Sequence, residues 1–478
     1  MFRKTTIALV AGLLFGAVAL LGMAGAGQDE VTGSAWRPCA EAPASYPARC
    51  ATFAVPVDWN NPAAGTLNLR VARLPAARQD QRIGTLMFNP GGPGGPAASI
   101  VADPDAVRAY FPREIRDRFD IVGVDPRGVG GSQALRCGAR PHQPEVSRFP
   151  RDAGAAAELA VRNARFAASC ERDSGSLVTN VDTESVARDL DAVRARLGEE
   201  RISFVGISYG TMLAQSYAEL FPDRLRSLVL DGPVDRSRSW WQLSRDGAAA
   251  TQDGVRRFSS WCARDSSCAL HRAGVLGTVE RVLTAADAGR LSANSRKVNA
   301  EEVALAVQGA LNSGDSHPEL ARLLRAAARG GDATTLLNWA PFRLPEMYTA
   351  HRTIVCQDVP VPPSAIAELP DEAEHLAELG PTLRGASEFW NIASGCAGWP
   401  APAKWRPHPW SVPADFPATV VLSGAHDVAT PRAWAESVHR QLPRSELVRW
   451  EGDGHTAWLN DPRARRAAID HLIAGSHR

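Results

Sequence analysis

Short apolar runs rich in β-branched residues alternate with helical stretches along the chain from about Ala51. Each run ends in Gly, Asp, Asn or Pro, which are turn-forming residues, so the runs are interpreted as strands. The expected strands are Thr52–Val57, Leu67–Leu74, Thr85–Phe88, Ile121–Val124, Ile202–Val205, Ser227–Leu230, Thr419–Leu422 and Leu447–Trp450. Because helices separate them, the pattern predicts an α/β fold with a mostly parallel central sheet flanked by helices, in which the last six runs form the core strands.

One of the intervening helices is well marked, over Glu184–Leu197. Its apolar residues Val186, Leu190 and Val193 recur at helical spacing, and Gly198 supplies a stop signal.

Strand-like runs are absent between Pro233 and Pro417, where helical periodicity takes over. Asn299 followed by Glu302 resembles a capping box that opens a helix, and Pro318–Ala328 has the pattern of an amphipathic helix. This stretch therefore predicts an inserted, mainly helical cap. The expected division is a core over 27–233, the cap over 234–416 and the rest of the core over 417–478.

The N-terminus has the pattern of a targeting segment. Arg3 and Lys4 precede the apolar run Ile7–Met23, which is followed by Ala-Gly-Ala. This order is typical of a secretory signal peptide over residues 1–26, with the mature chain starting at Gly27. The alternative is an uncleaved membrane anchor, because the run is nearly long enough to span a bilayer. We expect a secreted protein without stable membrane insertion after cleavage.

Length and charge narrow the class of protein further. With 478 residues, the chain exceeds the roughly 250–300 at which a single core usually stops growing, which agrees with a core plus an insertion. The formal net charge is +1 and the charges are dispersed along the chain instead of forming basic runs. A nucleic-acid partner is therefore not expected.

The sequence contains eight cysteines, an even number that favours disulfides in an exported protein. Sequence alone cannot select one of the roughly one hundred possible connectivities. We expect neighbours along the chain to pair: Cys39 with Cys50, Cys137 with Cys170, Cys262 with Cys268 and Cys356 with Cys396. No Cys-x-x-Cys and no accompanying histidine cluster is present in the sequence, so no metal site is predicted.

The strongest chemical signal is Gly206-Ile-Ser208-Tyr-Gly210, which lies between the strand Ile202–Val205 and an Ala-rich helical segment. A strand-to-helix elbow exposes a serine hydroxyl in strained backbone geometry, and the flanking glycines remove side chains that would clash at so sharp a turn. We therefore predict that Ser208 is a nucleophile.

A serine hydroxyl needs a base that accepts its proton. His455 directly follows the last predicted strand, at the loop position where a base is expected, and is the predicted base. His426 also follows a strand, but it immediately precedes an acid. The side chains of adjacent residues in a tight loop rarely form a hydrogen bond with each other.

The third group is an acid that orients the histidine, placed between serine and histidine in chain order. Asp427 follows Thr419–Leu422 and is the predicted acid. Asp231, which follows Ser227–Leu230, remains the alternative because the acid can stand one strand earlier.

Two N–H groups should stabilise the oxyanion of a tetrahedral intermediate. One is expected from Tyr209, the residue after the nucleophile. The other is expected from the loop Asn89-Pro-Gly-Gly-Pro-Gly-Gly95, where Gly92 is the preferred donor and Gly91 the alternative. This loop lacks the Gly-Lys-Ser/Thr ending of a phosphate loop.

Taken together, these motifs resemble the proline iminopeptidase and secreted tripeptidyl aminopeptidase branch of the α/β-hydrolases. The resemblance extends over essentially the whole mature chain. Asn89 stands where proline iminopeptidases usually have histidine, as in the secreted relatives. The segments that carry the resemblance are residues 89–94, Asp125–Ser132, 206–211, Phe221–Arg224, Val229–Gly232, Cys356–Asp358 and Cys396–Pro400.

The resemblance implies a secreted serine exopeptidase that releases short peptides from free N-termini through an acyl-enzyme, without a cofactor. Such an enzyme must capture an α-amino group, and Asp358 is the candidate carboxylate by motif position. The expected partner is a peptide or small-molecule substrate. A secreted esterase or amidase acting on a lipid or small metabolite has the same triad and is the alternative; a non-catalytic binding protein on this scaffold is a minor one.

Overall fold

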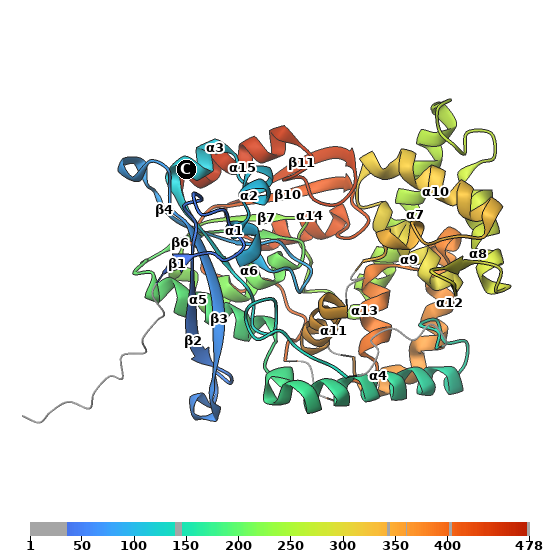
Figure 1. The fold of residues 1–478 in the computed structure, drawn as a ribbon, viewed down its shortest axis with the longest axis horizontal. Coiled ribbons are helices and arrows are strands. Elements are labelled where there is room, and N and C mark those ends of the chain that lie inside the picture. Colours follow the sequence, from blue (N-terminus) through green and yellow to red (C-terminus); the bar gives the residue numbers. More distant parts are fainter. Residues whose placement is uncertain (1–35, 139–145, 342–344, 360, 401–403, 476–478) are drawn as a thin grey trace, which may run out of the picture. The chain divides into compact units, whose positions relative to one another are not determined.

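The computed structural model of the protein describes residues 36–138, 146–341, 345–359, 361–400 and 404–475. The expected signal peptide lies outside these residues. Within them, one sheet of nine strands has the order β1-β2-β3-β5-β4-β6-β7-β10-β11 (Figure 1). The strands are β1 (Arg37–Pro38), β2 (Arg49–Pro56), β3 (Thr66–Leu74), β4 (Gly84–Asn89), β5 (Phe119–Val124), β6 (Ile202–Ile207), β7 (Leu225–Asp231), β10 (Thr419–His426) and β11 (Ser445–Asp453).

The sheet is parallel from β5 through β11 and antiparallel at the β1, β2 and β3 end. All eight strands expected from the sequence are present, and the expected core strands are the parallel ones. The α/β-hydrolase fold with a largely parallel central sheet is thereby confirmed. The carboxyl ends of β6, β10 and β11 lie along one edge, where the predicted nucleophile, acid and base follow.

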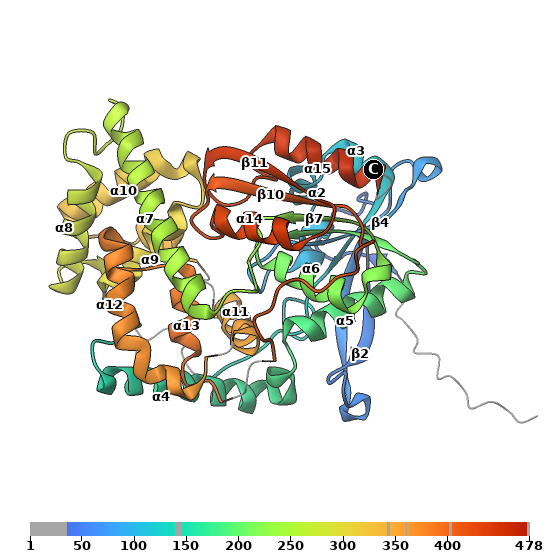
Figure 2. The same cartoon turned by 180° about the vertical axis from the view of Figure 1, so that it is seen from behind.

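Side chains alternate along each central strand into two separate cores. On β4, Leu86 and Phe88 face one core and Met87 the other, and all three are buried. Helices α1 (Ala97–Ala102), α2 (Pro104–Tyr110), α3 (Arg113–Arg118) and α15 (Pro462–Ala474) cover the first face. Helices α5 (Thr183–Arg196), α6 (Tyr209–Leu220) and α14 (Arg432–Gln441) cover the second (Figure 2). The expected helix over Glu184–Leu197 is α5.

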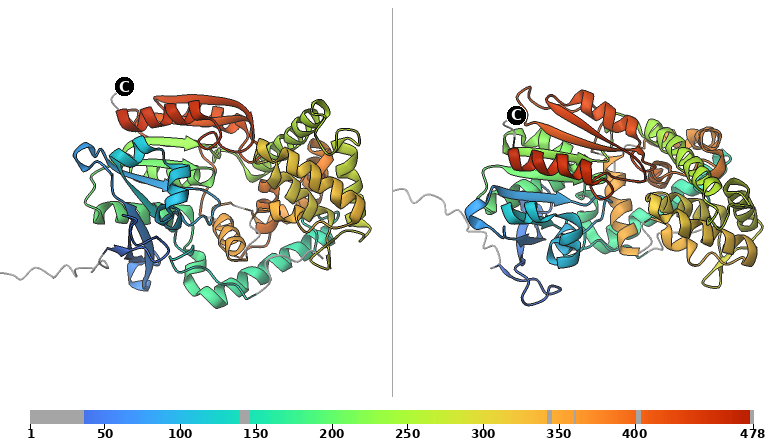
Figure 3. Two further views of the ribbon diagram at one scale, coloured as in Figure 1. Left: turned by 45° about the horizontal axis from the view of Figure 1, so that its top comes forward. Right: turned by 90° about the horizontal axis from the view of Figure 1, so that it is seen from above.

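The stretch between β7 and β10 is mainly helical. Its helices are α7 (Trp240–Arg264), α8 (Val275–Asp287), α9 (Ala300–Ala310), α10 (His317–Gly330), α11 (Pro345–Asp358), α12 (Leu369–Leu379) and α13 (Glu388–Cys396). Several of them share a third core that includes Phe258, Leu283 and Val307. Figure 3 shows the helices of this stretch gathered at one end of the molecule, beside the sheet. We call this helical part the cap.

Two helices of the cap that the sequence predicts are present in the structure. The capping box is present at α9, where the Asn299 side chain accepts from the Glu302 N–H at 2.9 Å and Glu302 accepts from the Asn299 N–H at 3.1 Å. The helix expected over Pro318–Ala328 is α10. The sequence pattern missed a hairpin of two-residue strands, Ser292–Ala293 and Arg296–Lys297, because strands so short have no detectable alternation.

Helix α4 (Ala153–Ser174) precedes β6 in the chain but packs along the cap (Figure 1). The amide of buried Asn163 donates to the carbonyl oxygens of Ser394 and Ala397, each at 2.9 Å. A segment inserted before the nucleophile therefore supports the cap as well as the segment inserted after it.

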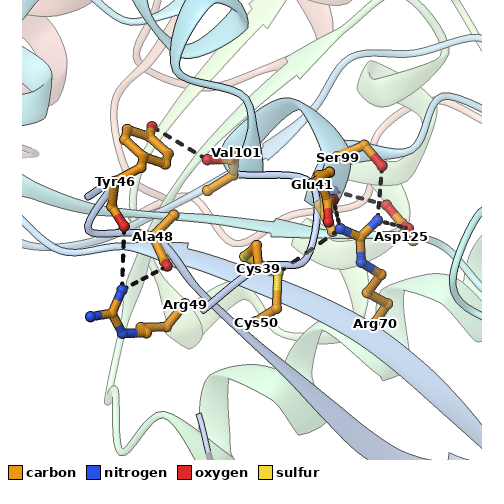
Figure 4. Close-up of a disulfide and its surroundings, with 11 residues drawn as sticks. Cys39, Glu41, Tyr46, Ala48, Arg49, Cys50, Arg70, Ser99, Val101 and Asp125 are labelled. Carbon is orange, nitrogen blue, oxygen red and sulfur yellow. Dashed lines mark hydrogen bonds and ion pairs between the residues drawn. A yellow bond between two sulfur atoms is a disulfide. The ribbon is translucent and has the colours of Figure 1, made fainter. Parts of the chain in front are cut away.

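The eight cysteines form four disulfides between the expected neighbours: Cys39–Cys50, Cys137–Cys170, Cys262–Cys268 and Cys356–Cys396. The first fastens the start of the described chain beside Arg70, whose guanidinium donates to Ser99 Oγ at 2.9 Å (Figure 4). Among the described residues, no helix combines the length and apolar character that crossing a bilayer requires.

Candidate active site

Ser208 stands at a sharp turn between β6 and α6, with φ 56° and ψ −124°. A non-glycine residue in this backbone region costs on the order of 1–3 kcal/mol, which the surroundings must offset. The flanking glycines are required by close approach: a Cβ on Gly206 would lie 2.4 Å from the Gly210 carbonyl oxygen, and one on Gly210 would lie 2.6 Å from that of Asn89. The predicted elbow is therefore present as a strained and tightly packed turn.

The structure brings His455 and Asp427 together. His455 Nδ1 lies 2.8 Å from Asp427 Oδ2 and 3.0 Å from Oδ1. Asp427 follows β10, and its carboxylate also accepts from the N–H groups of Ala429 and Thr430 at 2.9 and 2.8 Å. Since Nδ1 faces the carboxylate, the other ring nitrogen of His455 is left to accept a proton.

The electrostatics of this pair follow from burial and charge. Burial raises the pKa of Asp427, but His455 and the backbone N–H donors outweigh it and hold that pKa below its ordinary value. Burial lowers the pKa of His455, whereas Asp427, Glu388 and Asp231 stabilise its cationic form and hold the pKa above its usual range. Asp427 thus stabilises an imidazolium, as proton transfer from a serine requires.

The two alternatives left open by the sequence have other partners. The Asp231 carboxylate accepts from the N–H groups of Ala457 and Trp458 at 2.8 and 2.9 Å, and its backbone carbonyl accepts from the Ser208 N–H at 2.8 Å. Asp231 thereby ties the elbow to the segment after His455. His426 pairs instead with Asp253 of the cap, with Nδ1 2.7 Å from Oδ2.

The glycine loop after β4 lies beside the elbow. A Cβ on Gly91 would lie 3.0 Å from Ser208 Cβ and 3.4 Å from the Tyr209 backbone nitrogen. The Gly91 N–H donates to Asn89 Oδ1 at 3.0 Å, so this alternative oxyanion donor is already engaged. Gly92 lines the same pocket as Ser208 and Tyr209, which favours the Gly92 and Tyr209 N–H groups as a donor pair.

A pocket between the core and the cap opens onto Ser208, and we call it the cap pocket. Its walls are largely apolar, and its charged members are Arg236, Arg238, Asp358 and Glu388. The apolar lining comes from several separate segments: Met212, Val234, Trp240, Leu243, Val355, Phe389, Ile392 and Trp405. An apolar pocket with a few placed charges is the usual form of a small-ligand site.

Asp358, at the end of α11, lies in the cap pocket, but both of its oxygens are engaged. Oδ1 accepts from the Thr183 N–H at 3.0 Å, and Oδ2 accepts from Thr183 Oγ1 at 2.5 Å. That hydroxyl also lies 2.5 Å from the Tyr209 hydroxyl. Burial raises the pKa of Asp358 to about 6. Asp358 therefore links the cap to α5 and to the residue that follows the nucleophile.

Glu388, the first residue of α13, was missed by the sequence reasoning. It lines the cap pocket, and the structure records no hydrogen bond to its side chain within the described residues. Burial raises its pKa to about 7, an effect that nearby His455 opposes and Asp427 reinforces. The only signal was an acidic residue in the first turn of a helix, which ordinarily reads as a favourable helix-dipole contact.

No group of three or more His, Cys, Asp or Glu side chains suited to a metal gathers among the residues that the structure describes. The candidate site consists of Ser208, His455 and Asp427, and Gly92 and Tyr209 join Ser208 in the lining of the cap pocket.

Comparison with known proteins places this site in a family. Residues 84–274 match the α/β hydrolase fold family model, and residues 382–477 match the TAP-like protein model. Serine protease Hip1 of Mycobacterium tuberculosis is 30% identical over 92% of this chain and 89% of its own length. Carboxylesterase B of the same species is 32% identical over 89% of this chain and 84% of its own.

Tripeptidyl aminopeptidase of Streptomyces lividans is 33% identical over 46% of this chain and 42% of its own length. The chain is a serine hydrolase and belongs to the α/β-hydrolase family, in its tripeptidyl aminopeptidase-like peptidase branch.

Proposed function

We propose that the protein is an exported serine exopeptidase that releases short fragments from the free N-termini of peptides. The observation that carries this proposal is the cap pocket, which combines apolar walls with a carboxylate, Glu388, that has no hydrogen-bond partner among the described residues. A half-buried carboxylate beside a nucleophile offers an ion pair to an ammonium group.

The reaction assigns one role to each residue. Ser208 Oγ attacks the scissile carbonyl carbon while its proton passes to Nε2 of His455, and Asp427 stabilises the resulting imidazolium. The oxyanion accepts hydrogen bonds from the backbone N–H groups of Gly92 and Tyr209. His455 then donates the proton to the leaving amine as the C–N bond breaks, which leaves an acyl-enzyme. Water hydrolyses that ester by the same proton transfers in reverse order.

Glu388 and Asp358 contribute differently to capture of the substrate amine. Both oxygens of Asp358 already accept hydrogen bonds from Thr183, so it adds negative charge to the cap pocket instead of a free acceptor. Glu388 is available to pair directly with the ammonium. A substrate cation would also stabilise the ionised form of Glu388 against the burial that raises its pKa.

Export of the protein is supported by chemistry that favours an oxidising compartment. All eight cysteines are joined in disulfides, which persist outside the cytosol. This agrees with the signal peptide proposed for residues 1–26 and with a mature chain from Gly27.

An esterase or amidase is the second candidate, since Carboxylesterase B is as similar to this chain as the protease is. The triad serves both reactions, and only the cap pocket distinguishes them.

The test uses the chain from Gly27 with three substrates: an Ala-Ala-Pro chromogenic tripeptide with a free N-terminus, the same peptide N-acetylated, and a simple acyl ester. The Ser208→Ala variant is the control for contaminating hydrolases. We expect cleavage of the free peptide and little cleavage of the acetylated one. Turnover of the ester alone, or indifference to acetylation, would refute the exopeptidase proposal and favour the esterase.

A further inference from the structure

The loops that carry the acid and the base are both held by the cap. We define the acid loop as the last residue of β10 and the two after it, residues 426–428, and the base loop as the last residue of β11 and the two after it, residues 453–455. Helix α7 contacts both. Asp253 Oδ2 lies 2.7 Å from His426 Nδ1, and Arg257 donates to the Asp453 carboxylate through Nε at 2.7 Å and a terminal nitrogen at 3.3 Å.

The helix backbone itself approaches the acid loop between these two contacts. A Cβ on Gly254 would lie 2.4 Å from Val428 Cγ1, so the helix touches the residue next to Asp427. Residues 253 and 254 both lie on the same side of α7 as residue 257, because they precede it by four and three positions. One helix face thus spans two loops that come from different strands.

A second cap segment, the turn between α9 and α10, holds the base loop from its backbone. The Asn312 carbonyl accepts from the His455 N–H at 2.8 Å. Ser313 forms an antiparallel bridge with Gly454. The predicted base therefore has its own main chain hydrogen-bonded to the cap.

The strands behind the triad explain why such support is needed. All six residues of β6, which leads to Ser208, are buried, and β4 and β7 flank it. By contrast, β11, which leads to the base loop, is an edge strand, and none of its residues is fully buried. The core therefore supports the nucleophile through its leading strand, whereas it supports the base only from the segment after it, through the bonds of Ala457 and Trp458 to Asp231.

We propose that the cap is a positioning device for the triad, with Asp253 and Arg257 as positioning residues that hold the acid and base loops in register. Nothing in this role requires contact with substrate. The inference rests on the roles proposed for Asp427 and His455, and it extends the function of the cap beyond shaping a substrate pocket. A misplacement of about 1 Å can lower an enzymatic rate by about 100-fold, so a modest contact can have a kinetic effect.

The test compares two arginines of the same helix. Arg257→Ala removes the ion pair to the base loop, and Arg245→Ala removes a matched bidentate pair to Glu372 within the cap, with distances of 2.8 and 2.6 Å. The readouts are the rate of fluorophosphonate labelling at Ser208 and kcat for a small acyl ester. We expect Arg257→Ala to lower both about tenfold with an unchanged KM, and Arg245→Ala to leave both within about twofold.

Two further variants separate positioning from folding. Arg257→Lys keeps the charge and should restore most of the ester kcat. Combining Arg257→Ala with Asp453→Ala should cost no more than either single change if the two residues act as a pair. Full ester activity in Arg257→Ala, or an equal loss in Arg245→Ala, would overturn the inference.

A pH profile supplies a readout that a purely structural role would not move. The charged groups facing His455 are Asp427, Glu388 and Asp231. Loosening the base loop should weaken the contact with Asp427 and lower the His455 pKa, so the acid limb of ester kcat/KM should move to lower pH in Arg257→Ala alone. An unmoved limb would contradict the inference. Absence of labelling at Ser208 in the unmodified protein would instead refute the proposed function itself.

Discussion

The nucleophile elbow and the cap pocket adjoin each other at Ser208, but their residues are gathered in different ways. The elbow is made of consecutive residues between a buried strand and a helix, and its glycines are in contact with backbone atoms. The pocket collects side chains from segments as far apart as Pro93 and Thr430, and its walls are largely apolar. Local chain geometry thus determines the chemistry, whereas long-range packing determines what reaches it.

The largest expected effect concerns the two acids near the base. Asp427→Asn should lower kcat/KM for peptide and ester alike by about 10⁴-fold, because His455 would lose its orienting acceptor. Asp231→Asn is the matched control: its carboxylate bonds to Ala457 and Trp458 and not to His455, so the loss should be much smaller. Steady-state kinetics of the two variants settle the assignment, and a greater loss in Asp231→Asn would reverse it.

The next effect contrasts a glycine of the elbow with one of the cap. Gly206→Ala should destabilise the fold by about 3 kcal/mol, because its Cβ would overlap the Gly210 carbonyl oxygen. Gly330→Ala at the end of α10 meets no atom within 4 Å and should be neutral or stabilise by about 0.5 kcal/mol. Urea unfolding of both variants measures this. Equal stability of the two would show that the elbow is not tightly packed.

A smaller effect tests the pocket itself. Glu388→Gln should lower kcat/KM for the free tripeptide by about thirtyfold, equivalent to about 2 kcal/mol for a lost charged pair. The acyl ester, which carries no ammonium, should be cleaved at nearly the original rate. Equal losses on both substrates would assign Glu388 to the triad instead of to substrate capture.

The contrast between these regions also explains what the sequence could predict. The strands and the elbow were accessible because each depends on neighbouring residues or on turn chemistry. The expected disulfide pairs are present, although the sequence alone could not select them. Asp427 and His455 were accessible because the fold orders them along the chain. Glu388 resembled an ordinary acidic residue at the start of a helix. The contacts of α7 with the acid and base loops join residues that lie 173 and 196 positions apart in the sequence. Such packing leaves no local signal.

The smallest effect is a shift in pH dependence that connects the pocket to the triad. Neutral His455 is the active form, and three carboxylates hold its pKa above the ordinary value of about 6.5, so ester kcat/KM should fall with decreasing pH at a midpoint above 6.5. Glu388→Gln removes one of these charges and should move that midpoint down by about half a unit or more. A midpoint that stays unchanged would mean that Glu388 carries no charge while His455 titrates. In that case Glu388 would have to lose its proton before it could pair with a substrate ammonium. Peptide cleavage would then show a steeper pH dependence than ester cleavage.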